Sequence, residues 1–106
     1  MKQPNREQND TLYQAILALK DMDECRRFFQ DLCTVSELRA MEQRMEVAVL
    51  LDEDMIYNEI LERTGASSAT ISRVNRSLIY GAGGYESVLE KMKAAGENAV
   101  EEQDEE

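Results

Sequence analysis

The chain has 106 residues, enough for one domain with a modest hydrophobic core. It has 22 acidic and 12 basic residues, no histidine and two cysteines without CxxC spacing, so we expect neither a metal nor a cofactor. No stretch approaches the roughly eighteen consecutive apolar residues of a membrane span, and the amino terminus lacks the apolar core of a signal peptide. The composition therefore predicts a cytoplasmic protein with no membrane partner.

The net charge of −10 is unevenly distributed along the chain. The segment 96–106 contains six acids and no base, a composition typical of a disordered tail, so the sequence predicts a domain over 1–95 and a tail over 96–106. Residues 57–95, in contrast, carry five bases against four acids, and no Asp or Glu occurs from Arg63 to Tyr85. This acid-free window suits a surface that meets an anionic partner.

The amino-terminal half has helical periodicity. A first helix from Thr11 has an apolar face made of Leu12, Ile16 and Leu19. Asp21 and Glu24 have the spacing of a capping box and predict the start of a second helix.

Thr34 and Glu37 form a second capping signal, which predicts a third helix from Val35 to about Glu53. Within it, the run "VAVLL" at 47–51 is apolar on every side and needs cover on every side. In so short a chain this run predicts burial against a second subunit as well as the chain's own core.

The segment 57–78 reads as helix, turn and helix. We expect Tyr57–Thr64 to form the first helix, with Ile60 and Leu61 facing inward. Gly65 is expected to end this helix in the left-handed conformation. Ser67 or Ser68 caps the next helix. The predicted apolar positions of that helix are Ala69, Ile71, Val74 and Leu78. "YGAGGY" ends it, and a last amphipathic helix follows. The apolar positions of this last helix are Tyr85, Val88, Leu89 and Met92.

The spacing around Gly65 is that of a DNA-binding helix-turn-helix, in which Ile60, Ile71 and Val74 hold the two helices at a fixed angle. Leu61 departs from it, since a small residue normally stands there. Short polar residues and arginines suit base edges and phosphates, so we expect the outward surface to bind double-stranded DNA. The predicted DNA-binding residues are Asn58, Ser67, Ser68, Ala69, Thr70, Ser72, Arg73, Asn75 and Arg76.

"LCTVSELRAMEQRMEVAVLL" followed by "YNEILERTGASSATISRVNRSLIYGAGGY" resembles the Trp repressor superfamily, and within it the Trp-repressor-related YerC/YecD family. The similarity runs from about Leu12 to Met92. The resemblance implies an all-α fold of six helices in an intertwined homodimer. It also implies a bacterial transcription regulator, most simply a repressor.

The same resemblance implies a ligand site. Arg44 and Arg73 match the arginines that hold tryptophan in the Trp repressor, and Thr34 and Ser77 match two further pocket residues. Val74 departs from the pattern, because the repressor has glycine against the indole ring. We therefore expect that tryptophan is not the effector, although an unidentified smaller effector between Arg44 and Arg73 remains compatible with the sequence.

Two other functions compete with DNA regulation. A dimeric helical adaptor that binds other proteins without specific DNA binding fits the helical pattern and the acidic tail. RNA is also compatible, although no aromatic stacking platform accompanies the arginines. No catalytic triad can be built without histidine, and "GAGG" follows no strand, so we do not expect an enzyme.

Overall fold

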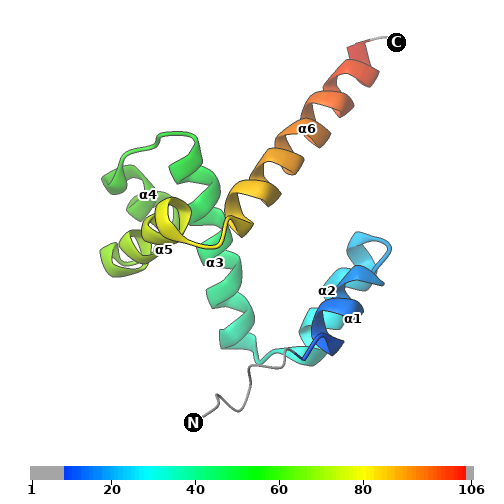
Figure 1. The fold of residues 1–106 in the computed structure, drawn as a ribbon. Coiled ribbons are helices and arrows are strands. Elements are labelled where there is room, and N and C mark those ends of the chain that lie inside the picture. The colour runs from blue at the N-terminus through cyan, green and yellow to red at the C-terminus, as the bar shows by residue number, and fades with distance from the viewer. Residues whose placement is uncertain (1–8, 105–106) are drawn as a thin grey trace. The chain divides into compact units, whose positions relative to one another are not determined.

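The computed structural model describes the backbone of residues 9–104 and the side chains of residues 9–97. All of the regular structure within these limits is α-helical (Figure 1). The helices are α1 (Thr11–Leu17), α2 (Met22–Leu32), α3 (Val35–Asp52), α4 (Tyr57–Thr64), α5 (Ser68–Tyr80) and α6 (Gly84–Asp104). This order confirms the predicted all-α, six-helix fold. None of the described helices is both long and apolar enough to cross a membrane.

The chain divides into two compact units between Leu38 and Arg39. In the first, α1 ends at Leu17, so Leu19 lies beyond the helix whose apolar face it was predicted to share. Neither α1 nor α2 contains a buried residue, and the side chain of Leu17 is 85% exposed.

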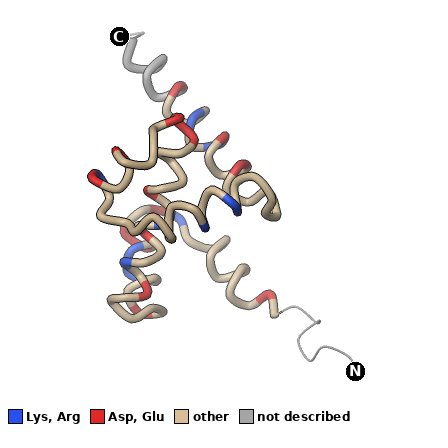
Figure 2. The backbone as a smooth tube through the Cα atoms, turned by 90° about the vertical axis from the view of Figure 1, so that its left-hand side faces the viewer, with Lys and Arg blue, Asp and Glu red and all other residues tan. Residues whose placement is uncertain are grey.

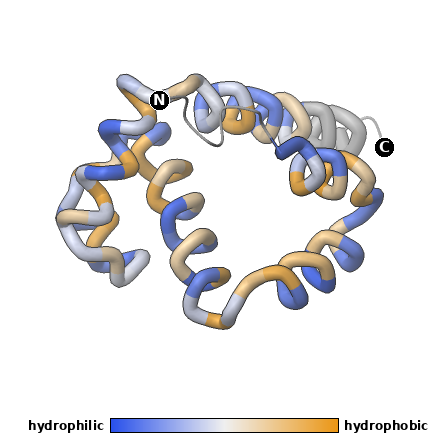
Figure 3. The backbone as a smooth tube through the Cα atoms, turned by 60° about the horizontal axis from the view of Figure 1, so that its bottom comes forward, coloured by the Kyte–Doolittle hydropathy of each residue, from blue (hydrophilic) through white to orange (hydrophobic). Residues whose placement is uncertain are grey.

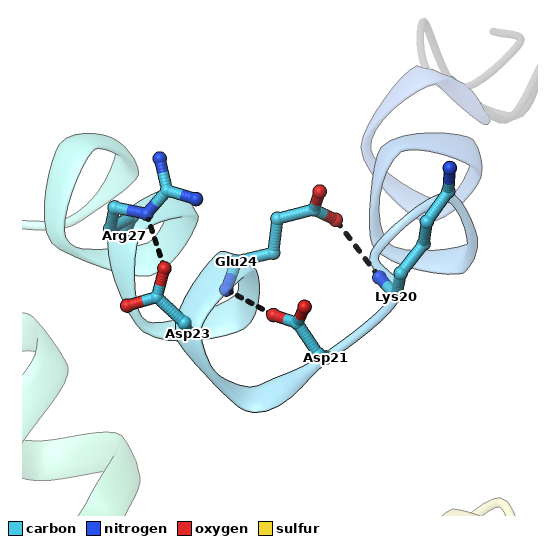
Figure 4. Close-up of polar contacts among 5 residues, drawn as sticks. All are labelled: Lys20, Asp21, Asp23, Glu24 and Arg27. Carbon is cyan, nitrogen blue, oxygen red and sulfur yellow. Dashed lines mark hydrogen bonds and ion pairs between the residues drawn. The ribbon is translucent and has the colours of Figure 1, made fainter.

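Capping contacts at the start of α2 explain why this helix begins where it does (Figure 4). Asp21 Oδ1 accepts a hydrogen bond of 2.8 Å from the Glu24 backbone N–H, which confirms the predicted cap. The Glu24 carboxylate accepts from the N–H of Lys20 at 2.9 Å, one residue before the expected partner. An ion pair of 3.0 Å between Arg27 and Asp23 lies one turn further on.

The start of α3 is a reciprocal capping box. Thr34 Oγ1 accepts from the Glu37 N–H at 3.1 Å, and the Glu37 carboxylate accepts from the Thr34 N–H at 2.9 Å. Two N–H groups that the helix itself cannot satisfy are thereby paired, and the predicted start at Val35 is confirmed.

The hydrophobic core lies in the second unit, where α4 and α5 lie beside the carboxyl-terminal part of α3 (Figure 1). Apolar segments alternate with polar ones along these helices (Figure 3). The buried apolar residues are Val47, Ala48, Leu50, Ile60, Ala66, Ile71, Val74 and Leu89. Within "VAVLL", the chain itself buries Val47, Ala48 and Leu50, while Val49 and Leu51 are half-buried. This run therefore needs less cover from a second subunit than the sequence predicted.

Helix α6 extends further than the sequence predicted. It continues past Gly96 to Asp104, so the predicted disordered tail is helical up to that residue, and residues 105–106 lie outside the described part of the chain. A single helical glycine costs only about 1 kcal/mol, which is not enough to end a helix.

Lys93 Nζ lies 2.8 Å from Asp52 Oδ2 and connects α6 to the end of α3. The hydrogen bond and charge of Asp52 raise the pKa of Lys93.

Gly81 allows the chain to turn between α5 and α6. Its N–H donates to the Ser77 carbonyl at 2.9 Å, and a Cβ at this position would lie 2.3 Å from that oxygen. Any larger residue would displace the last turn of α5. The predicted end of α5 at "YGAGGY" is confirmed by this geometry.

Candidate DNA-binding surface

Gly65 makes the turn between α4 and α5. Its φ of 72° is left-handed, and its N–H donates to the Leu61 carbonyl at 2.9 Å. An added Cβ would meet no atom within 4 Å, so backbone conformation rather than space favours glycine here. Both the end of α4 and the glycine cap agree with the prediction.

Thr64 fixes the same turn through its side chain. Its hydroxyl donates to the Ile60 carbonyl at 2.8 Å and accepts from the Ala66 N–H at 3.0 Å. The backbone carbonyl of Thr64 accepts a third bond, of 3.1 Å, from Nε2 of Gln43 on α3. Thr64 and Gln43 were not predicted as functional residues, because no local pattern in the sequence distinguishes them from other polar residues of the helices.

Three side chains hold α4 and α5 together. Ile60 and Ile71 are fully buried and Val74 is 1% exposed, as the helix-turn-helix spacing predicted. Leu61 was wrongly predicted to face inward, since its side chain is 38% exposed. A large residue fits there because it lies at the surface rather than between the helices.

Ser67 is the cap of α5. Its Oγ accepts from the Thr70 N–H at 3.1 Å and lies 3.1 Å from the Thr70 hydroxyl, which decides between the two predicted caps, Ser67 and Ser68. Ala69, which was predicted both as an apolar position of this helix and as a DNA-binding residue, is exposed, whereas Ala66 in the turn is buried.

The outward face of α5 contains the predicted DNA-binding residues. Its exposed members are Ser67, Ser68, Ala69, Ser72, Arg73 and Arg76, and Thr70 and Asn75 are half-buried. Asn58, in the first turn of α4, is exposed. Asp and Glu residues lie outside α5, on other helices and loops of the chain (Figure 2). This helix therefore presents hydrogen-bonding groups and two guanidinium groups without a competing negative charge.

An open, apolar hollow of about 500 Å³ lies beside the α5–α6 junction. It is lined by Met45, Ser77, Gly81, Ala82, Gly84, Tyr85 and Val88. Among the residues that the resemblance suggested for a ligand, Ser77 lines this hollow, whereas Arg44 and Arg73 do not. Arg44 is half-buried on α3, and Arg73 and Ser77 are exposed on α5.

Thr34, the remaining suggested ligand residue, lies in the first unit. Its hydroxyl already accepts the capping bond from Glu37. No cluster of three potential metal ligands occurs among the residues that the structure describes.

The sequence of residues 7–93 matches the protein family described as Trp repressor protein. This stretch includes α1 to α5, the turn at Gly65 and the first part of α6. The chain belongs to the Trp repressor family.

Relatives of the Trp repressor family agree in sequence and in fold. The uncharacterized protein YerC of Bacillus subtilis (strain 168) is 52% identical over 84 residues, which are 79% of this chain and 81% of YerC. A TrpR-like protein of Eubacterium eligens superimposes with a TM-score of 0.77 at 55% identity, over 79% of this chain and 87% of that chain. A candidate Trp repressor of Staphylococcus aureus gives a TM-score of 0.77 at 45% identity, over 79% and 84% of the two chains. The predicted resemblance to the YerC branch of the Trp repressor family is thus confirmed.

Proposed function

We propose that the chain binds specific sites in double-stranded DNA as a homodimer and regulates transcription in the bacterial cytoplasm as a repressor. The observation that carries this proposal is the exposed, carboxylate-free face of α5. The turn at Gly65 and the buried side chains of Ile60, Ile71 and Val74 hold this helix against α4. Membership of the Trp repressor family supports the same function. In this arrangement α5 enters the major groove and α4 crosses the sugar-phosphate backbone.

The charge distribution supports DNA over a protein partner. Arg73 and Arg76 are exposed on α5, and no acid occurs between Arg63 and Tyr85 in a chain with a net charge of −10. An acidic side chain on this face would repel phosphate, whereas a protein-binding surface has no such restriction.

Selection from a pool of random duplexes tests the proposed function. The purified full-length chain should enrich a defined sequence, and its affinity for that duplex should exceed its affinity for random DNA by at least about a thousandfold at one salt concentration. Recovery of an unenriched pool would exclude specific DNA binding and favour the adaptor. Tighter binding to single-stranded RNA than to any duplex, measured at the same salt concentration, would favour the RNA alternative.

We expect the chain to form a dimer at micromolar concentration. Large apolar side chains are exposed on α1, α2 and α6, including Leu17 at 85%, Met22 at 64% and Met92 at 51%. Exposed apolar side chains of this size are typical of surfaces that bind another protein, and a second copy would remove them from water. Sedimentation equilibrium should give twice the chain mass, and a folded monomer at these concentrations would contradict the proposal.

We expect that L-tryptophan does not bind as a corepressor. Val74 matches the position where the repressor has glycine, and its side chain is 1% exposed in the core between α4 and α5. Room for an indole there would require displacing packed atoms, at a cost of about 1–3 kcal/mol. Isothermal calorimetry should detect no micromolar binding of L-tryptophan, and DNA affinity should not change when it is added. Saturable binding that strengthens DNA binding would restore the corepressor mechanism.

A further inference from the structure

A single side-chain hydrogen bond connects α3 to the turn of the helix-turn-helix. Gln43 Nε2 donates to the Thr64 carbonyl at 3.1 Å, and both groups are partly buried. That carbonyl belongs to the last residue of α4, where the helix itself supplies no partner. Because a carbonyl can only accept, the amide of Gln43 must present its NH₂ group to it.

The bond from Gln43 is made to Thr64, the residue whose own hydrogen bonds hold the turn. The Thr64 hydroxyl bonds to Ile60 and Ala66, so the residue connects the end of α4 to the turn. Its carbonyl is held from α3 at the same time. Gly65 follows at once, and α5 begins at Ser68. A shift at Thr64 would therefore be passed directly to the start of α5.

Apolar packing alone fixes this orientation less sharply. Val47 and Ala48 of α3 contribute to the core with Ile60 and Ile71, but dispersion and hydrophobic contacts have little directional preference. A hydrogen bond has a narrow range of distance and angle. The bond from Gln43 thus adds a directional constraint between α3 and the two DNA-binding helices.

We infer that Gln43 is a positioning residue for DNA recognition. It sets the orientation of α4 and α5 relative to the second half of α3, and its loss reduces sequence discrimination more than affinity for DNA in general. Discrimination suffers more because base contacts need tighter geometry than phosphate contacts. The inference rests on the proposed DNA-binding function and extends it to a residue outside the DNA-facing surface.

The test compares Gln43→Met and Gln43→Glu with Gln30→Met and Gln30→Glu. Methionine keeps the length of the side chain and removes the donor, and glutamate keeps the shape and presents an acceptor to the carbonyl. Gln30 is an exposed residue on α2, so the same chemical changes there serve as matched controls. For each full-length variant, the Kd for the selected duplex and for random DNA is measured at one salt concentration. The thermal midpoint without DNA is also measured.

Gln43→Met should lower the ratio of the two affinities by about three- to tenfold, the equivalent of one hydrogen bond, and Gln43→Glu by at least as much. The Gln30 variants should keep the wild-type ratio. An unchanged ratio in folded Gln43→Met, or an equal loss of affinity for both duplexes with a lowered midpoint, would overturn the inference. If Gln43→Glu does not fold, the uncharged Gln43→Met decides. Lack of any preference in the wild-type chain would instead refute the proposed function, and the inference with it.

Discussion

Replacing both Arg73 and Arg76 with alanine should weaken binding to the selected duplex by about ten- to a thousandfold. The two guanidinium groups are exposed on the face of α5 that we propose to meet DNA. If the arginines contact guanine edges, their loss should lower the preference for the selected sequence over random DNA. If they contact phosphates, their loss should weaken the salt dependence of binding. The magnitude of the slope of log K against log salt should fall by about 0.9 for each phosphate contact removed.

A second double variant separates this effect from net charge. Arg26 and Arg27 lie next to each other on α2 and are exposed, so Arg26→Ala with Arg27→Ala removes the same charge elsewhere. It should change affinity far less than the α5 variant in a fluorescence anisotropy titration. Equal losses from the two double variants would mean that overall charge rather than the α5 surface drives binding.

Truncation of the Ile71 side chain should strongly lower the stability of the fold. This side chain is fully buried where α5 packs in the core, and Ile71→Ala should lower the free energy of unfolding by about 2–5 kcal/mol. The cost combines lost apolar burial with the cavity left behind. Urea denaturation followed by circular dichroism, at one fixed protein concentration, measures it.

Ile79 supplies a control on the same helix. Its side chain is 60% exposed, so Ile79→Ala removes the same atoms and makes the same change in helix propensity without opening a cavity. We expect a change within about 0.5 kcal/mol. Similar losses at both positions would show that Ile79 is covered in solution, for example by a second copy of the chain.

Local signals in the sequence predicted much of the fold. The capping pair Thr34 and Glu37 predicted the start of α3, and Gly65 predicted the end of α4, because each depends on residues within one turn. Periodicity predicted the burial of Ile60 and Ile71 for the same reason.

Features that depend on packing between distant segments were not predictable in this way. The exposure of Leu61 depends on which residues pack against α4, and the bond from Gln43 to Thr64 joins residues that are far apart in the sequence. The cover of "VAVLL" depends on how the rest of the second unit packs over it, which periodicity within α3 cannot show. The sequence pattern indicated the exposed polar face of α5, whereas Gln43, which bonds to the turn from α3, has no local signal in the sequence.

The separation of charges within the second unit would affect the rate at which the protein associates with a polyanion such as DNA. The acids around α5 lie on other elements, such as Glu59 on α4, Glu86 at the start of α6 and Asp54 in the loop after α3. A duplex that approached those faces would be repelled, whereas the face of α5 would attract it. The field of the unit would thus favour encounters in one orientation and shorten the search among unproductive ones, most strongly at low ionic strength. In this way the acidity of the chain would contribute to the speed of correct docking, although by itself it opposes DNA binding.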